Sequence, residues 1–339
     1  MKKRVTVLFL VCLMLTAVAG CGKKPKEKTS LEDLGERTEY MDDAAVTVDD
    51  VAVSYREAML YLQTAKQEYE SAYGSDIWQY MLNEDGSTLG EWVKNQTLDQ
   101  IVYIKIICAE AKKLGIELDS EEKKRVTERT EEYMSQAEYS ALALYGIARK
   151  DVEQVYTDNA LAQKLYDSVT LNVDTDISNE EAAQKHLQSL VLKNYHEDSL
   201  GNRSPLTVLE LIATLDRYEA LYEDAKTTKD FYSLAYANSE DKEYLDIYVG
   251  DGELPAELSA AYNLKTGEAM QIRAESGYYI FYCVSEFDED ATIAKKEELI
   301  ARKQEEAFKE LYASWRSAAK VEVNELIWKA IGFDLEAEG

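Results

Sequence analysis

Residues 264–285, with the sequence LKTGEAMQIRAESGYYIFYCVS, contain the strongest structural signal in the chain. Two short runs, Ala269–Arg273 and Tyr278–Ser285, have the composition of strands, and the second is strongly apolar and aromatic. Glu275-Ser276-Gly277 lies between them and supplies a glycine for a turn. The stretch therefore predicts an antiparallel β-hairpin.

The residues before this hairpin alternate between strand and helix patterns. The predicted strands are Leu187–Lys193 and Tyr244–Val249, and the predicted helices are Leu206–Lys226, Asp230–Ala237 and Pro255–Asn263. With the hairpin, the order is β-α-α-β-α-β-β, which predicts a compact α+β domain. We place this domain at residues 178–288.

Both flanks of that domain have helical patterns. Residues 44–177 contain a capping-box sequence at Ser54–Glu57, followed by long helices that include Glu91–Leu114 and Arg149–Leu171. Residues 289–339 contain one long helix and a short final one. Because the apolar stripe that ends at Trp315, Ile327 and Trp328 needs a partner, we expect this segment to pack on the N-terminal helices and complete one helical domain. The predicted fold class is α+β, mainly helical.

The N-terminus has the pattern of an export signal. Basic residues precede an apolar run too short for an ordinary membrane span, and Val18-Ala19-Gly20-Cys21 follows. This segment resembles a bacterial lipobox, which implies a signal peptide at residues 1–20 and lipidation of Cys21. The alternative is a plain signal peptide with a chance cysteine. Residues 21–43 begin with a basic, polar stretch and are predicted to be a tether.

Composition excludes several kinds of site. The formal charge is −27, which argues against nucleic acid because phosphate binding needs clustered Lys and Arg. Two His and four Cys leave little for a zinc site, and no cofactor motif is present, so we expect neither metal nor cofactor. The 24 Tyr are abundant beside the 6 Phe. Tyrosines suit adaptable binding surfaces, and the candidates in the helical part are Tyr61, Tyr69, Tyr73, Tyr80, Tyr139, Tyr145 and Tyr156.

Several of these motifs resemble a known family. Leu264–Glu268 followed by Gly277–Ile280 is similar to the "LKxGE…GYHII" hairpin of parvulin-type peptidyl-prolyl isomerases. Phe231–Ala235 with Ser239 resembles that family's "F..LA…S" helix. With an export signal and helical flanks, the chain resembles the PrsA/SurA-type extracytoplasmic foldases. This resemblance implies a helical chaperone domain with a parvulin-like domain inserted into it.

The resemblance also assigns the family's site positions. It implies catalytic positions at Ser189, Asp241 and Tyr279, and substrate-binding positions at Leu254, Leu258, Tyr262 and Ala274. Both histidines of the family are replaced here, one by Ser189 and the other by Tyr279. His186 could take the place of Ser189 only through a register shift of three residues, and an odd shift turns a strand residue to the other face. His196 is predicted to be a solvated loop residue.

These observations predict a lipid-anchored folding factor on the extracytoplasmic face of the cell membrane. Its partners would be unfolded or folding exported polypeptides and the membrane lipid, and a homodimer is compatible with this interpretation. Since hydroxyl groups do not reproduce two titratable imidazole rings, we expect weak or absent isomerase activity. The alternatives are an active prolyl isomerase with a rearranged site, and an envelope-assembly or solute-binding lipoprotein without a folding role.

Overall fold

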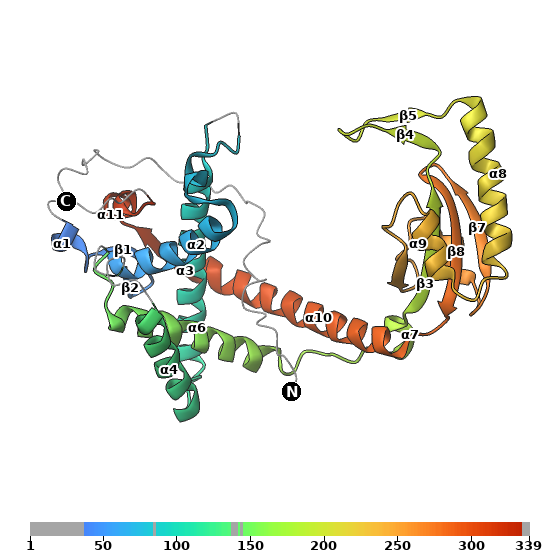
Figure 1. Ribbon diagram of the computed structural model, residues 1–339. Coiled ribbons are helices and arrows are strands. Elements are labelled where there is room, and N and C mark those ends of the chain that lie inside the picture. Colours follow the sequence, from blue (N-terminus) through green and yellow to red (C-terminus); the bar gives the residue numbers. More distant parts are fainter. Residues whose placement is uncertain (1–36, 84–85, 137–141, 143–144, 334–339) are drawn as a thin grey trace. The chain divides into compact units, whose positions relative to one another are not determined.

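The computed structural model describes residues 37–83, 86–136, 142 and 145–333 (Figure 1). The chain divides into two compact units, which we describe separately. Unit 1 contains the residues up to Asn172 together with those from Ala307 onward, and unit 2 contains Val173–Glu306. The predicted signal peptide at residues 1–20, the predicted lipidation site at Cys21 and the tether up to residue 36 lie outside the described residues.

Unit 1 is mainly helical. Its helices are α1 (Arg37–Tyr40), α2 (Tyr55–Tyr73), α3 (Leu89–Lys113), α4 (Ser120–Gln136), α6 (Arg149–Thr170), the last turns of α10 (Glu289–Ala318) and α11 (Glu325–Ala330), with a 3-10 turn η3 (Ser75–Gln79). The Oγ atom of Ser54 accepts a hydrogen bond from the backbone N–H of Glu57 at 3.2 Å, which fixes the start of α2. Only half of the predicted capping box forms there, because the Glu57 side chain turns into the core instead.

A three-stranded sheet joins the two chain segments of unit 1. Two of its strands, β1 (Ala44–Val48) and β2 (Val51–Ser54), are joined by a turn in which Asp49 has φ 52°. β9 (Val321–Val323) pairs antiparallel with β1, so Val46 lies opposite Val323. The sheet order is therefore β2-β1-β9, and a C-terminal strand completes a sheet that N-terminal residues begin.

The C-terminal segment also supplies side chains to the core of unit 1. Ile327 and Trp328 are buried among residues of α2, α3 and β1, and Trp315 packs against the same cluster. Phe333 stacks on Trp78 with ring centroids 3.8 Å apart, and its carbonyl oxygen accepts a hydrogen bond from Lys66 Nζ at 3.1 Å. Gly90 passes close to this pair, since a Cβ atom there would lie 3.1 Å from the Trp78 carbonyl oxygen.

Three charged residues meet inside unit 1 where α2, α3 and α6 pack together. Lys105 Nζ lies 2.5 Å from Glu57 Oε1 and 2.5 Å from Asp158 Oδ2, and all three side chains are less than a tenth exposed. Gln154 donates a further hydrogen bond to Asp158 at 2.8 Å. Two carboxylates and one ammonium give this buried triad an excess negative charge.

Unit 2 is an α+β unit around a four-stranded antiparallel sheet with the order β6-β3-β8-β7. Its elements are α7 (Asn179–Ala182), β3 (Lys185–Leu192), β4 (Tyr195–Glu197), β5 (Arg203–Pro205), α8 (Val208–Ala225), α9 (Phe231–Asn238), β6 (Asp246–Val249), η4 (Ser259–Asn263), β7 (Ala269–Ala274), β8 (Gly277–Ser285) and most of α10. The predicted hairpin is β7–β8, which confirms the α+β fold class. The predicted helix Pro255–Asn263 is wrong: among these residues only the five of η4 form a helix, and it is of the 3-10 type.

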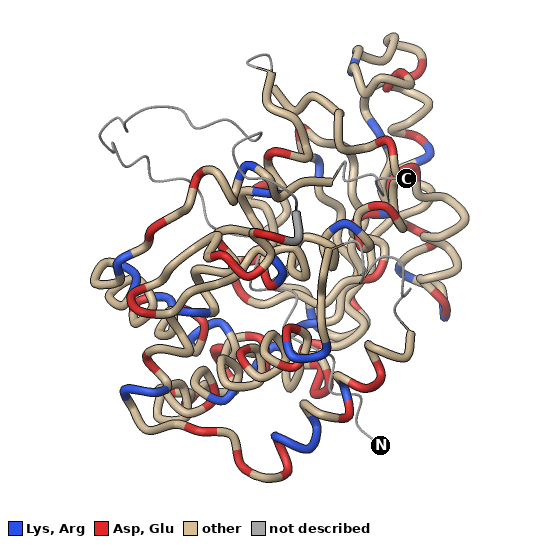
Figure 2. Tube along the Cα trace, turned by 90° about the vertical axis from the view of Figure 1, so that its left-hand side faces the viewer, with Lys and Arg blue, Asp and Glu red and all other residues tan. Residues whose placement is uncertain are grey.

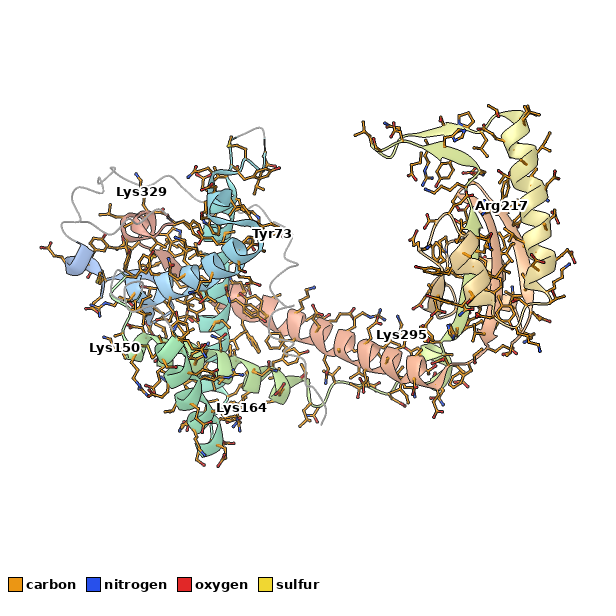
Figure 3. The ribbon with its side chains drawn as sticks, in the orientation of Figure 1. Tyr73, Lys150, Lys164, Arg217, Lys295 and Lys329 are labelled. Atoms are coloured by element: carbon orange, nitrogen blue, oxygen red, sulfur yellow. The ribbon has the colours of Figure 1, made fainter. Side chains whose placement is uncertain are left out.

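The predicted boundary at residue 289 differs from the observed one, because the first turns of α10 belong to unit 2. Thr292 Oγ1 accepts a hydrogen bond from the Gln184 backbone N–H at 3.0 Å, and Leu299 packs with Ile177 and Ala182. Lys295, labelled in Figure 3, pairs with Glu253 at 2.8 Å. One helix of 30 residues is thus shared by both units.

No helix among the described residues combines the length and apolar character needed to cross a membrane. No group of His, Cys, Asp and Glu among them could hold a metal ion. Figure 2 shows carboxylates and basic residues interspersed along the trace.

Candidate functional site

The central strand β3 separates two apolar layers in unit 2. Leu187 and Val191 face a cluster that includes Leu254, Leu258, Tyr279 and Phe281. Leu190 and Leu192 face the opposite way, onto α8 and α9. This alternation places Ser189 on the first face, with the residues that the family resemblance assigns to the site.

Ser189 is fully buried, and its polar atoms form hydrogen bonds within the protein. Its Oγ donates a hydrogen bond to the carbonyl oxygen of Tyr244 at 2.8 Å, and its backbone N–H donates to Leu245. These bonds hold the chain that enters β6 against β3. Ser189 lies opposite Phe281 in the ladder and Tyr279 lies opposite Val191, so the two predicted site residues are diagonal neighbours on one face.

Tyr279 is the first donor in a hydrogen-bond network that the sequence patterns did not predict. Its hydroxyl donates to Ser276 Oγ at 3.0 Å, and Ser276 donates to the Glu257 carboxylate. The other Glu257 oxygen accepts the backbone N–H of Glu275 at 3.0 Å. Burial raises the pKa of Tyr279 above its ordinary value, so the phenol stays protonated and acts as a donor at neutral pH.

Gly277 makes this network possible at the β7–β8 turn. Its φ of 149° disfavours a side chain, and a Cβ atom there would lie 3.0 Å from the carbonyl oxygen of Leu192. The turn therefore lies tightly against β3 and brings Ser276 beneath the Tyr279 hydroxyl.

The remaining predicted site residues lie around the same face but do not form one polar cluster. Asp241 accepts the backbone N–H of Glu243 within its own loop at 3.0 Å. Ala274 is half-buried at the end of β7, and Tyr262 is half-buried beside the core. The carbonyl oxygens of Tyr262 and Leu264 both accept hydrogen bonds from the buried Lys185 Nζ, which fixes the end of η4 to β3.

The predicted proline cup is filled by its own side chains. Leu254 is 7% exposed and Leu258 is 1% exposed, and both belong to the same buried apolar cluster of unit 2 as Tyr279. A proline ring needs open apolar surface, whereas these side chains are already covered. The apolar residues are therefore present as the resemblance implies, but in this structure they form core rather than a binding surface.

Neither histidine enters this site. His186 lies on the opposite face of β3, where its Nε2 is 2.7 Å from Asp246 Oδ1 and its ring stacks on Tyr248. His196 lies in β4 rather than in a loop, and its Nε2 is 3.2 Å from Glu210 Oε2. A shifted register does not place His186 beside Tyr279.

The candidate tyrosines of the helical part divide into buried and exposed groups. Tyr61 and Tyr145 are in the core of unit 1, so they cannot be contact residues for a client. Tyr73, labelled in Figure 3, is 71% exposed and Tyr80 is 66% exposed. Tyr69 and Tyr156 are partly buried, and Tyr139 lies outside the described residues.

The α+β unit with its parvulin-type hairpin, set within a chain of helices, indicates the class of extracytoplasmic foldases. The sequence is 24% identical over 339 residues to "Foldase protein PrsA" of Caldanaerobacter subterraneus subsp. tengcongensis, covering 95% of this chain and 96% of the relative. It is also 24% identical to "Foldase protein PrsA" of Clostridium botulinum (strain Loch Maree / Type A3), over 72% of this chain and 77% of that relative. No family model matches the chain. The predicted resemblance is confirmed: the chain is a distant relative of the PrsA foldases.

Solved structures similar to this one include the peptidylprolyl isomerase PrsA of Bacillus anthracis, with 15% identity and a TM-score of 0.31 over 65% of this chain and 96% of that chain. A second is the foldase protein PrsA of Streptococcus pneumoniae, with 18% identity and a TM-score of 0.31 over 76% of this chain and 99% of that chain.

Restoring the family's histidines is expected not to create an isomerase. In a Ser189→His/Tyr279→His variant, the imidazole at position 189 enters a fully buried position and overpacks the core. This overpacking is expected to lower the free energy of unfolding by about 1–3 kcal/mol. The filled cup still offers no surface for proline. An isomerisation assay tests whether the variant is active, and unfolding followed by circular dichroism measures its loss of stability. Gln188→His, one residue away on the other face, is the matched control and is expected to cost less. Clear acceleration by the double variant would contradict the filled cup.

Proposed function

We propose that this protein is an extracytoplasmic folding factor for exported proteins, anchored to the membrane by a lipid on Cys21, and that unit 2 serves it as a binding domain rather than an efficient isomerase. The observation that carries the proposal is similarity to foldases over 95% of the chain. The lipobox-like Val18–Cys21 segment supports the anchor. Its clients would be unfolded polypeptides that have crossed the membrane.

The geometry of unit 2 supports the weak isomerase activity in this proposal. Rotation about a prolyl bond crosses a barrier of about 18–20 kcal/mol. A catalyst must bind the twisted amide more tightly than the planar one. Here Leu254 and Leu258 are buried, and Tyr279 gives its hydroxyl hydrogen to Ser276. The two leucines therefore offer little exposed surface to a proline ring, and the Tyr279 hydroxyl is already used as a donor.

One observation favours a second candidate, an isomerase with a rearranged site. The chain of hydrogen bonds from Tyr279 through Ser276 to Glu257 is a polar network at the position of the family's second histidine. A site of this kind would need the side chains of Leu254 and Leu258 to turn aside while Glu257 keeps its hydrogen bond to Ser276, so that the network borders exposed apolar surface. Activity through it would require Tyr279 and Glu257 together.

The deciding experiment measures two activities on residues 22–339, which contain both units whole. We expect suppression of aggregation of an unfolded client, without acceleration of prolyl isomerisation in a protease-coupled peptide assay. Uncatalysed isomerisation takes tens to hundreds of seconds, so even modest acceleration would be visible. Acceleration that is lost in Tyr279→Phe and Glu257→Gln would support the second candidate. Absence of both activities would contradict a folding role and favour a non-foldase lipoprotein.

A further inference from the structure

The first turns of α8 present an uncovered apolar face. Val208 is 73% exposed, Leu209 80% and Ile212 51%. On a helix, residues three and four apart are neighbours, so these three side chains form one continuous patch. The later part of α8 buries Tyr218, Leu221 and Ala225 against the sheet, which holds the helix in place. We call Val208, Leu209 and Ile212 the α8 patch.

The α8 patch is held on a well-ordered support. Thr207 and Glu210 form a reciprocal capping box, in which the Thr207 backbone N–H donates to Glu210 at 2.8 Å. Glu210 also contacts His196 of β4 at 3.2 Å, which ties the β4–β5 hairpin to the start of the helix. The apolar side chains are therefore displayed by a capped helix rather than by a loose segment.

The surroundings of the α8 patch are acidic. Residues 193–226 have a formal charge of −3: the basic residues are Lys193, Arg203, Arg217 and Lys226, and the carboxylates are Glu197, Asp198, Glu210, Asp216, Glu219, Glu223 and Asp224. All four basic residues are engaged within unit 2: Lys193 pairs with Glu197, and Lys226 pairs with Glu223 at 2.6 Å. The Arg203 guanidinium lies 4.2 Å from the centre of the Tyr195 ring, and Arg217, labelled in Figure 3, pairs with Glu240 at 2.7 Å.

This negative charge favours some binding partners of the α8 patch over others. A second copy of the same face would bring two acidic surfaces together, which like charges disfavour. An anionic lipid surface would be repelled in the same way. A segment that carries apolar side chains and positive charges would satisfy both the patch and its acidic surroundings.

We propose that the α8 patch is a docking surface for extended, apolar polypeptide segments that carry lysine or arginine. This inference rests on the proposed folding role and assigns its client contact to a place separate from the Tyr279 face. The excess of carboxylates around the patch would then favour the binding of basic clients and raise their rate of association.

The test uses residues 22–339 and a fluorescein-labelled, unstructured peptide with four leucines and four lysines separated by glycine and serine. A second peptide has glutamate in place of lysine. By fluorescence anisotropy at low salt we expect the lysine peptide to bind and the glutamate peptide to bind at least about tenfold more weakly. Added salt should weaken the binding of the lysine peptide.

The decisive variant is Leu209→Ser/Ile212→Ser, and its matched control is Leu114→Ser/Leu171→Ser. The control leucines lie in unit 1 and are 57% and 77% exposed, so both variants remove similar apolar surface. We expect the α8 variant to lose about tenfold or more in affinity for the lysine peptide, and the control to change by less than about twofold. Circular dichroism should show both variants folded.

Three outcomes of the binding and sedimentation measurements would overturn the docking surface. They are equal peptide binding by the α8 variant and the wild type, absence of peptide binding by the wild type, and a change from dimer to monomer in the α8 variant by sedimentation. The last would assign the patch to self-association. If the wild type suppresses client aggregation and the α8 variant does so equally well, the docking surface fails while the proposed function stands. If the wild type does not suppress aggregation, the proposed function itself fails.

Discussion

Replacing Lys105 with methionine is expected to lower the free energy of unfolding of unit 1 by about 3–5 kcal/mol. The ammonium group is 4% exposed and lies 2.5 Å from both the Glu57 and the Asp158 carboxylates. Without it, two carboxylates remain buried beside each other with no cation between them. All four tryptophans, Trp78, Trp92, Trp315 and Trp328, lie in unit 1, so urea unfolding followed by tryptophan fluorescence measures this unit selectively.

The control for this prediction neutralises the whole triad. A Lys105→Met/Glu57→Gln/Asp158→Asn variant removes the ammonium and both negative charges, and it should recover most of the lost stability because no unpaired charge stays buried. A loss below about 1 kcal/mol in Lys105→Met alone would show that water or a structural rearrangement reaches the carboxylates.

The same triad predicts a pH dependence. Burial raises the pKa of Glu57 above its ordinary value of 4.5, although Lys105 lowers it in part. A group with a raised pKa in the folded state contributes stability below its unfolded pKa and loses that contribution as pH rises through the folded value. Glu57→Gln removes this loss, so the stability of this variant relative to the wild type should increase as the pH rises above 4.5. An unchanged difference would contradict the raised pKa.

Replacing Phe333 with alanine is expected to destabilise unit 1 by about 3 kcal/mol. The ring is 9% exposed and stacks on Trp78 with an interplanar angle of 7°. Its loss leaves a cavity beside Gly90 and exposes the indole to water. The change is measured in the same urea experiment, and a red shift of the native tryptophan emission should accompany it.

The matched control for Phe333 is Phe287→Ala. Phe287 is 49% exposed and lies in unit 2, so the same chemical change there should alter stability by less than about 0.5 kcal/mol. If Phe333→Ala unfolds like the wild type, the C-terminal residues do not contribute to the core of unit 1 in solution. The tryptophan emission of the folded variant would then also be unchanged.

Local patterns predicted the main elements of the fold because those elements carry local signals. The β7–β8 hairpin follows from its strand-like runs and the Gly277 turn, and α3 and α6 lie within two residues of their predicted starts. The segment before Leu264 was predicted to be helical but forms only a short 3-10 turn. There, the side chains of Leu258 and Ala261 are recruited into the sheet core, and Lys185 binds the carbonyl oxygens of Tyr262 and Leu264.

The candidate site was less accessible from sequence because its decisive features are nonlocal. The identities of Leu254 and Leu258 suggest a cup, but only the packing of Tyr279 and Phe281 determines that the cup is filled. The Glu257 network joins residues about twenty positions apart, and no spacing rule predicts it. Lys105 offered a clearer signal, since a lone lysine inside the apolar run Ile104–Cys108 needs buried partners.

The division of unit 1 between the two ends of the chain has a consequence for the order of folding during synthesis. Unit 2 is one continuous segment and has all its residues once Glu306 is made. Unit 1 cannot be completed before β9, Ile327, Trp328 and Phe333 have been synthesised. The edge of β1 that pairs with β9 therefore stays unpaired while the whole of unit 2 is made. A long-range closure of this kind is slow to form. The nascent protein therefore passes through a stage in which its first helices expose apolar faces, and its own maturation depends on keeping them from aggregating.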